Sequence, residues 1–357
     1  MKRRDLLRRI GATAMAMAAA RAASGVSPTA DAASNGSPGS VAAAGKPVPL
    51  SRGLHPQQSL QALRTAEARL HIAETLHKEW ARPVCVAAYQ MRNHCGGEAG
   101  KQGNLERMLG SIEQGQREGV QLMAFPEMCL QGYFTPVSGS VAEAVEANHG
   151  LADVVGESDS LKRLQEAAAK AKMVLVFGFA EKAEDQVFNS AGVIDADGRW
   201  VGVRRKNPLY PWPYELESFA EPEKAARSTV FDTAVGRIGV SVCFDGEFGE
   251  SVRQMRLDGA ELLVWINAAC GDSKLGTAHR LNAAGAHAEA NLLWVVCCNC
   301  AAPNSSGTSS IYPPSGEPLV ILSPNGEEMG IATINLAMNK DWSIWKDRVV
   351  KNVEPQG

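Results

Sequence analysis

The stretch RIGVSVCFDGEFGES, residues 237–251, decides the fold of this chain. An apolar run ends at Cys243, and a glycine-containing turn then leads into a segment with a helical pattern. A strand, a turn and a helix in this order are typical of an α/β domain. A thiol at such a turn faces helix N-terminal amides, which favour a thiolate and can stabilise an oxyanion. The alternative is an ordinary buried strand cysteine.

The alternation of strands and helices continues on both sides of this stretch. The sequences DADG (195–198) and SPNG (323–326) indicate hairpin turns, and therefore some antiparallel pairs. One α/β domain without an internal boundary is predicted over 82–345. Strands are predicted at 84–90, 120–127, 172–181, 189–198, 236–245, 261–268, 292–299 and 309–316, and helices at 103–118, 158–171, 249–258 and 277–290.

The composition excludes several classes of function. Of the 357 residues, 45% are hydrophobic and 21% charged, which is enough apolar material for a sizeable core. Lysine and arginine number 36 against 39 acidic residues, so the net charge of -3 gives no support for a nucleic-acid partner. No apolar run reaches the roughly 18 residues that a membrane span needs.

The N-terminal region has the layout of an export signal. KRRDLLRR (2–9) precedes a short apolar stretch and alanine-rich text with candidate cleavage sites at Ala23 and Ala30. This predicts a twin-arginine-like signal peptide over 1–30 and a periplasmic or secreted protein. The alternatives are a basic helix or a misassigned start site.

The segments around the predicted domain have their own patterns. Residues 31–57 are rich in Ser, Gly, Pro and Ala, which indicates a flexible linker. Leucines at near-helical spacing predict an N-terminal helix over 58–81. Residues 346–357 are interpreted as a C-terminal tail.

The chain has eight cysteines, several of them inside apolar runs such as WVVCCNC (294–300). An exported protein could form disulfides. The CCNC cluster lacks the spacing of a zinc site, so core packing is favoured over metal binding.

Two further residues stand at strand ends. Glu127 follows an apolar strand in AFPEMCLQGY (124–133), and Lys206 lies in GVRRKNPLYPWP (202–213), with Arg204 and Arg205 expected to be its solvated neighbours. Each alone has an ordinary explanation, a capping carboxylate or a solvated cation. A nucleophilic thiol, however, needs a base and a cation, and these two residues would supply both.

The order and local text of these segments resemble the nitrilase superfamily, also called carbon–nitrogen hydrolases, over about residues 82–345. Six segments carry the resemblance in the same order as in the family. They are VCVAAYQM, GNLERMLGSIEQGQREGVQLMAFPEMCLQGY, VFNSAGVIDADGRWVGVRRKNPL, RIGVSVCFDGEFGESVRQMRLDGAELLV, HAEANLLWVVCCN and SGTSSIYPPSGEPL.

The resemblance implies a role for each candidate residue. Glu127 matches the general base, Lys206 the cation that stabilises the transition state, and Cys243 the nucleophile. A second active-site glutamate is expected in an E-S segment, where Glu217 in LESF fits best and Glu215 is the alternative. The family fold is an α-β-β-α sandwich, usually assembled as homodimers or larger homo-oligomers, and neither a cofactor nor a metal is implied.

Other residues are expected around these four. The Phe244 amide would join Lys206 at the oxyanion, and Tyr133 and Trp212, with Tyr214, would line the pocket unless they belong to the core. Glu247 stands where branches acting on carboxylate substrates carry arginine, which favours a neutral or cationic amide if Glu247 faces the pocket; it could instead point outward. His287 replaces a usual arginine, which implies an altered structural contact.

The predicted function is hydrolysis of a small, neutral linear amide to acid and ammonia through a thioester. Asp245–Gly246 resembles the aliphatic-amidase branch. The alternatives are a nitrilase acting on a nitrile, an N-carbamoyl amide hydrolase, acyl transfer by the same thioester, and a non-catalytic binding module on this scaffold.

Overall fold

The computed structural model describes residues 50–51, 82–135, 138–223, 229–269, 274–302 and 305–337. The predicted signal peptide, the helix at 58–81 and the C-terminal tail lie outside the described residues. Within the predicted linker, Leu50–Ser51 form strand β1 and pair in parallel with Met329 and Gly330. These two residues are therefore not linker but part of a sheet.

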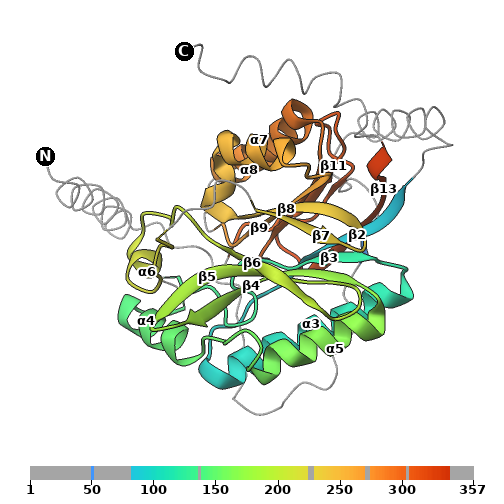
Figure 1. Ribbon diagram of the computed structural model, residues 1–357. Coiled ribbons are helices and arrows are strands. Elements are labelled where there is room, and N and C mark those ends of the chain that lie inside the picture. Colours follow the sequence, from blue (N-terminus) through green and yellow to red (C-terminus); the bar gives the residue numbers. More distant parts are fainter. Residues whose placement is uncertain are drawn as a thin grey trace, which may run out of the picture.

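Two β-sheets face each other, and helices cover the outer face of each (Figure 1). The first sheet has seven strands in the order β1 (Leu50–Ser51), β13 (Glu328–Asn335), β2 (Pro83–Gln90), β3 (Leu122–Ala124), β4 (Val174–Ala183), β5 (Gln186–Ile194) and β6 (Trp200–Arg205). The second has six, in the order β12 (Val320–Ile321), β11 (Ser310–Tyr312), β10 (Trp294–Asn299), β9 (Leu262–Asn267), β8 (Gly236–Val242) and β7 (Val230–Thr233).

The helices complete a four-layer sandwich. Helices α3 (Gly97–Arg117) and α5 (Asp159–Ala171) cover the first sheet, and α7 (Gly249–Leu257) and α8 (Lys274–Asn291) cover the second (Figure 1). Two short helices, α4 (Val141–Gly150) and α6 (Pro213–Leu216), lie together at one end. The predicted α-β-β-α sandwich with a single catalytic domain is confirmed.

The inner strands are almost wholly apolar because both of their faces are buried, whereas the edge strands β6 and β7 are partly exposed. In β9, Leu262, Val264 and Ile266 belong to the core between the two sheets, whereas Leu263 and Trp265 pack in the core beneath α7 and α8. This twofold alternation is what a pleated strand imposes. It explains why the sequence shows continuous hydrophobic runs instead of alternating ones.

The hairpin prediction was right at DADG and wrong at SPNG. DADG connects β5 and β6, which are antiparallel neighbours. SPNG connects β12 and β13, which belong to different sheets, so the chain crosses between layers there. The sequence interpretation expected β6 and β13 only as the second strands of the DADG and SPNG hairpins, without giving their bounds, and it missed α4, α6, β7 and β12.

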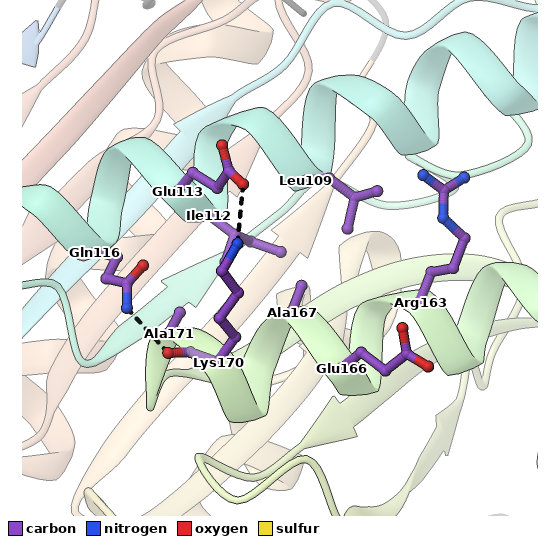
Figure 2. Close-up of a pocket in the computed structure, with 9 residues that line it drawn as sticks. All are labelled: Leu109, Ile112, Glu113, Gln116, Arg163, Glu166, Ala167, Lys170 and Ala171. Atoms are coloured by element: carbon purple, nitrogen blue, oxygen red, sulfur yellow. Dashed lines mark hydrogen bonds and ion pairs between the residues drawn. The ribbon is translucent and has the colours of Figure 1, made fainter.

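A groove of about 220 Å³ lies between α3 and α5 (Figure 2). Its floor is apolar, with Leu109, Ile112 and Ala167, and charged side chains surround it. Lys170 Nζ there lies 3.4 Å from Glu113 Oε1. None of the residues singled out from the sequence lines this groove, so it is separate from the candidate site.

Candidate active site

Glu127 is a buried carboxylate in the turn after β3. Its Oε1 accepts hydrogen bonds from Lys206 Nζ and Asn189 Nδ2, both at 2.7 Å. Its Oε2 accepts one from the Ala268 amide at 2.8 Å. Three donors from three different segments hold the carboxylate in one orientation.

The turn that carries Glu127 fits closely against β4. Met128 has a positive φ of 50°, so the chain bends sharply just after the glutamate. A Cβ on Gly178 of β4 would lie 2.3 Å from the Met128 nitrogen and 2.5 Å from the Glu127 Cα. Only glycine leaves room for this approach, which fixes the distance between β4 and the glutamate.

Lys206 directly follows β6, and its side chain is fully buried. Its Nζ donates to Glu127 Oε1 at 2.7 Å and to Glu215 Oε1 at 2.6 Å. Burial opposes the charge, but the Cys243 sulfur, once ionised, and the carboxylates of Glu127 and Glu215 outweigh burial and raise the pKa of Lys206 well above its usual value. The lysine is therefore a fixed cation in the site.

The second glutamate of the site is Glu215, not Glu217. Glu215 is buried and accepts hydrogen bonds from Lys206 Nζ at 2.6 Å, from the Tyr210 amide at 2.9 Å and from the Tyr133 hydroxyl. Glu217 is exposed at the end of α6. Residues two positions apart point to different sides of a helical turn, so only one of the two can reach Lys206. Burial and the nearby Glu127 raise the pKa of Glu215.

Cys243 begins a 3₁₀ helix, Cys243–Glu247, directly after β8. It has a positive φ of 49°, and its carbonyl accepts a hydrogen bond from Trp265 Nε1 at 2.8 Å. The Ala268 amide, which donates to Glu127 Oε2, also lies close enough to the Cys243 sulfur to oppose the rise in its pKa. Burial, and then the charge of Glu127, raise the pKa of Cys243 well above its usual value. A thiol of this kind stays protonated until a base removes its proton.

Asp245 connects the strand of the lysine with the turn of the cysteine. Its Oδ1 accepts from the Val242 amide at 2.7 Å, and its Oδ2 lies 3.0 Å from Arg204 Nη2 and accepts from the Asn207 amide at 3.4 Å. Val242 precedes the cysteine, and Asn207 follows the lysine. Burial raises the pKa of Asp245 to about 6, although Arg204 opposes that shift.

The expectation that Arg204 and Arg205 are solvated was wrong. Arg204 is buried against Asp245. Arg205 is partly buried and binds Glu181 through two nitrogens, at 2.8 and 2.7 Å. Both arginines lie in a strand, and carboxylates from other segments neutralise them. The sequence alone does not show these partners.

The turn after Cys243 packs on its neighbours through Gly246. A Cβ there would lie 2.3 Å from Trp265 Nε1. His287 of α8 makes a 2.8 Å hydrogen bond to the Gly246 carbonyl through Nε2, and burial lowers the pKa of His287. His287 thus makes a structural contact beneath the turn, as predicted.

Aromatic side chains surround the candidate site. Tyr133 is buried beside Glu215, and Trp212 stacks over it with ring centroids 6.4 Å apart. Phe244, which follows the cysteine, is half-buried. Glu247 is exposed, with Oε2 3.7 Å from His279 Nε2, so it lies at the surface and not inside the site. Tyr214 packs on Trp212, and its hydroxyl donates to the Gly139 carbonyl.

The cysteines of the CCNC cluster are buried, as predicted from their context. Cys297 packs beneath α8, and Cys298 packs between the sheets. Cys300 lies in a small cluster with Met128 and Ala268. Across the described part of the chain, no group of three or more His, Cys, Asp and Glu side chains is placed to hold a metal ion. Likewise, no described helix is long and apolar enough to cross a membrane.

Sequence reasoning missed three groups that shape the site: Asn189, the Ala268 amide and Asp245. A polar residue inside an apolar strand is a usable signal, and Asn189 in VFNSAGVI is such a case. The Ala268 amide and the partners of Asp245 had no signal, because backbone groups and contacts between sheets leave no pattern in the sequence.

Comparison with known proteins places this chain among characterised sequences and structures. The profile of a family described as carbon-nitrogen hydrolase matches residues 85–343. A citrullinase of Francisella tularensis is 28% identical over 261 residues, covering 69% of this chain and 89% of that protein. An N-carbamoylputrescine amidase of Arabidopsis thaliana is 30% identical over 209 residues, covering 53% and 70%. The structure of Saccharomyces cerevisiae Nit3, a member of the nitrilase superfamily, superposes with a TM-score of 0.62 at 22% identity, covering 77% of this chain and 96% of that one.

Proposed function

This chain belongs to the carbon–nitrogen hydrolase family, and we propose that it hydrolyses a small neutral amide to an acid and ammonia through a thioester on Cys243. The observation that carries the proposal is the buried Lys206 ammonium, which donates to Glu127 at 2.7 Å and to Glu215 at 2.6 Å. The Cys243 sulfur lies close enough to Lys206 and Glu127 for their charges to shift its pKa, so nucleophile, base and cation share one site. The Ala268 amide fixes the other oxygen of Glu127 at 2.8 Å.

In the first half-reaction, Cys243 Sγ attacks the carbonyl carbon while Glu127 accepts the thiol proton. The carbonyl oxygen becomes an oxyanion, which Lys206 and the Phe244 amide stabilise. One oxyanion donor is worth about 3–4 kcal/mol of barrier. The raised pKa of the thiol makes this base necessary, because the cysteine is not ionised beforehand.

The first half-reaction ends when the tetrahedral intermediate collapses. Glu127 returns its proton to the nitrogen, ammonia leaves, and an acyl group remains on sulfur. In the second half-reaction, Glu127 takes a proton from water, which attacks the thioester carbonyl. The acid departs, and the proton returns to the thiol, so the enzyme ends in its starting state.

The charges around the site favour an uncharged substrate. Two carboxylates, Glu127 and Glu215, flank one ammonium group, whereas Glu247 lies at the surface beside His279 and takes no part. A substrate carboxylate would be repelled by these groups. The chain therefore fits a neutral or cationic amide better than an N-carbamoyl amino acid.

A second candidate is hydrolysis of a carbamoyl compound without a carboxylate. The similarity to an N-carbamoylputrescine amidase supports it. The similarity to a citrullinase supports the carbamoyl group alone, because citrulline itself carries a carboxylate. Nitrile hydrolysis would use the same nucleophile, base and cation, and is the third outcome to be tested.

The test is ammonia release from propionamide, propionitrile, N-carbamoylputrescine and an N-carbamoyl amino acid at equal concentrations. We expect propionamide to be hydrolysed fastest and the anionic carbamoyl compound slowest. Cys243→Ala should remove all turnover and leave a folded protein. Preference for the anionic substrate, or full activity of Cys243→Ala, would overturn the proposal.

A further inference from the structure

Large hydrophobic side chains that are strongly exposed gather beside the candidate site. In the described ranges they are Tyr210, Leu216 and Phe248, exposed by 45%, 43% and 41%. Tyr210 and Leu216 lie in the segment that follows Lys206, and Phe248 lies in the turn that follows Cys243. The exposed apolar surface is therefore placed on the two segments that carry the chemistry.

Three aromatic rings from these two segments are in contact. Phe244 lies between the other two, with its ring centroid 5.2 Å from that of Tyr210 and 5.2 Å from that of Phe248. The interplanar angles of 84° and 78° are those of edge-to-face pairs, which stabilise aromatic contacts. We call Tyr210, Phe244 and Phe248 the aromatic rim.

The aromatic rim is anchored to the reacting groups. Phe244 directly follows the nucleophile in the chain. The amide of Tyr210 donates to Glu215 Oε2 at 2.9 Å, and the other oxygen of that carboxylate binds Lys206. The aromatic rim is therefore connected to Cys243 through the chain and to Lys206 through Glu215, on the two segments that would surround a carbonyl bound at Cys243.

Exposed apolar surface of this kind points to a ligand. Aromatic side chains bury a large area when covered, and a grouped apolar patch on an otherwise polar surface usually marks a binding site. The rings also carry no charge that would recognise a small polar substrate. Their position next to the nucleophile favours the substrate itself as the group that covers them.

We propose that the aromatic rim binds an apolar group, alkyl or aryl, carried by the acyl part of the amide substrate. This inference rests on the proposed function, because it names the class of amide that the same site selects. It goes further in predicting that a chain of four or more carbons, or a phenyl ring, is preferred over the one- and two-carbon acyl groups of formamide and acetamide.

The first experiment compares kcat/KM for acetamide, butyramide, hexanamide and 3-phenylpropionamide. Each methylene that becomes buried should raise kcat/KM by roughly threefold to fourfold. Phe248→Ala should lower the ratio of kcat/KM for hexanamide to kcat/KM for acetamide at least tenfold. Leu216→Ala is the matched control, because Leu216 is exposed to a similar extent but takes no part in the ring contacts.

The second experiment separates the two proposals. Binding of hexanamide and acetamide to Cys243→Ala, with and without Phe248→Ala, is measured by calorimetry. If hexanamide binds more tightly than acetamide and this preference depends on Phe248, but the native chain hydrolyses neither, the binding role of the aromatic rim is supported and the proposed hydrolysis is rejected. Turnover with equal kcat/KM across the series, or the same chain-length dependence after Phe248→Ala, would reject the rim alone. A change in oligomeric size after Phe248→Ala with that dependence intact would instead make the rim a contact between copies.

Discussion

Replacing Arg204 with methionine should destabilise this fold in a strongly pH-dependent way. Methionine keeps much of the side-chain volume but leaves Asp245 buried without its cation. The pKa of Asp245 is already raised from 3.8 to about 6, which is roughly 2 units, and each unit is worth about 1.4 kcal/mol. Ionising this carboxyl in the folded protein therefore costs about 3 kcal/mol even beside Arg204.

The sign of the pH dependence follows from the direction of that shift. Because the folded pKa is raised, Asp245 binds its proton more tightly in the native state, and its ionisation lowers stability as pH rises from about 4 to about 6. Without Arg204 the pKa rises further. We expect Arg204→Met to lower the free energy of unfolding by about 3–5 kcal/mol at pH 8, which is the usual effect of leaving one charge of a buried ion pair without its partner. The loss should be much smaller at pH 5.

The assay is urea unfolding of the native chain, Arg204→Met, Asp245→Asn and the double variant at pH 8 and pH 5. The double variant removes both charges, so it should be close to native stability at pH 8. Its kcat should nevertheless fall, because Asp245 no longer connects the segments that carry Lys206 and Cys243. Two results would refute this reasoning. One is an equal loss of unfolding free energy for Arg204→Met at both pH values. The other is a double variant whose loss equals the sum of the losses of the two single variants.

Three further substitutions test how the site is held. Gly178→Ala should lower the free energy of unfolding in urea by about 1–3 kcal/mol and kcat at least tenfold. The reason is that its Cβ would lie 2.3 Å from the Met128 nitrogen beside Glu127; native kinetics would contradict this. Asn189→Ala should lower kcat about fivefold, because one lost hydrogen bond is worth about 1 kcal/mol, and should leave KM within twofold; a change confined to KM would argue against it. Glu215→Gln should lower kcat about 100-fold, equivalent to about 3 kcal/mol, whereas Glu217→Gln should keep it; equal kcat for the two variants would reject the assignment.

The sequence predicted the layers well, for a physical reason. Strands such as 261–268 and 292–299 are buried on both faces, so their apolar runs stand out from the surroundings. Hairpin signals are local, however, and SPNG could not reveal that the next strand joins the other sheet. Helix α4 was missed although Ser140 and Glu143 form a capping box that the sequence contains.

The candidate site was predictable where a residue ends a strand. Glu127, Lys206 and Cys243 each follow one directly or within a short turn, and the structure brings all three together. The choice between Glu215 and Glu217 failed because it depends on which side of a single helical turn faces the lysine. No periodicity can be read from four residues.

The pairing of Leu50 and Ser51 with β13 limits where this chain can be shortened. Among the described residues, β13 pairs with β2 on one side and with Leu50 and Ser51 on the other, at Met329 and Gly330. Processing at Ala23 or Ala30 would keep that protection. A truncated form starting at Arg82 would expose the edge of β13, and its unpaired backbone N–H and C=O groups would be able to pair with a strand of another molecule. Preparations for crystallisation should therefore begin upstream of Leu50.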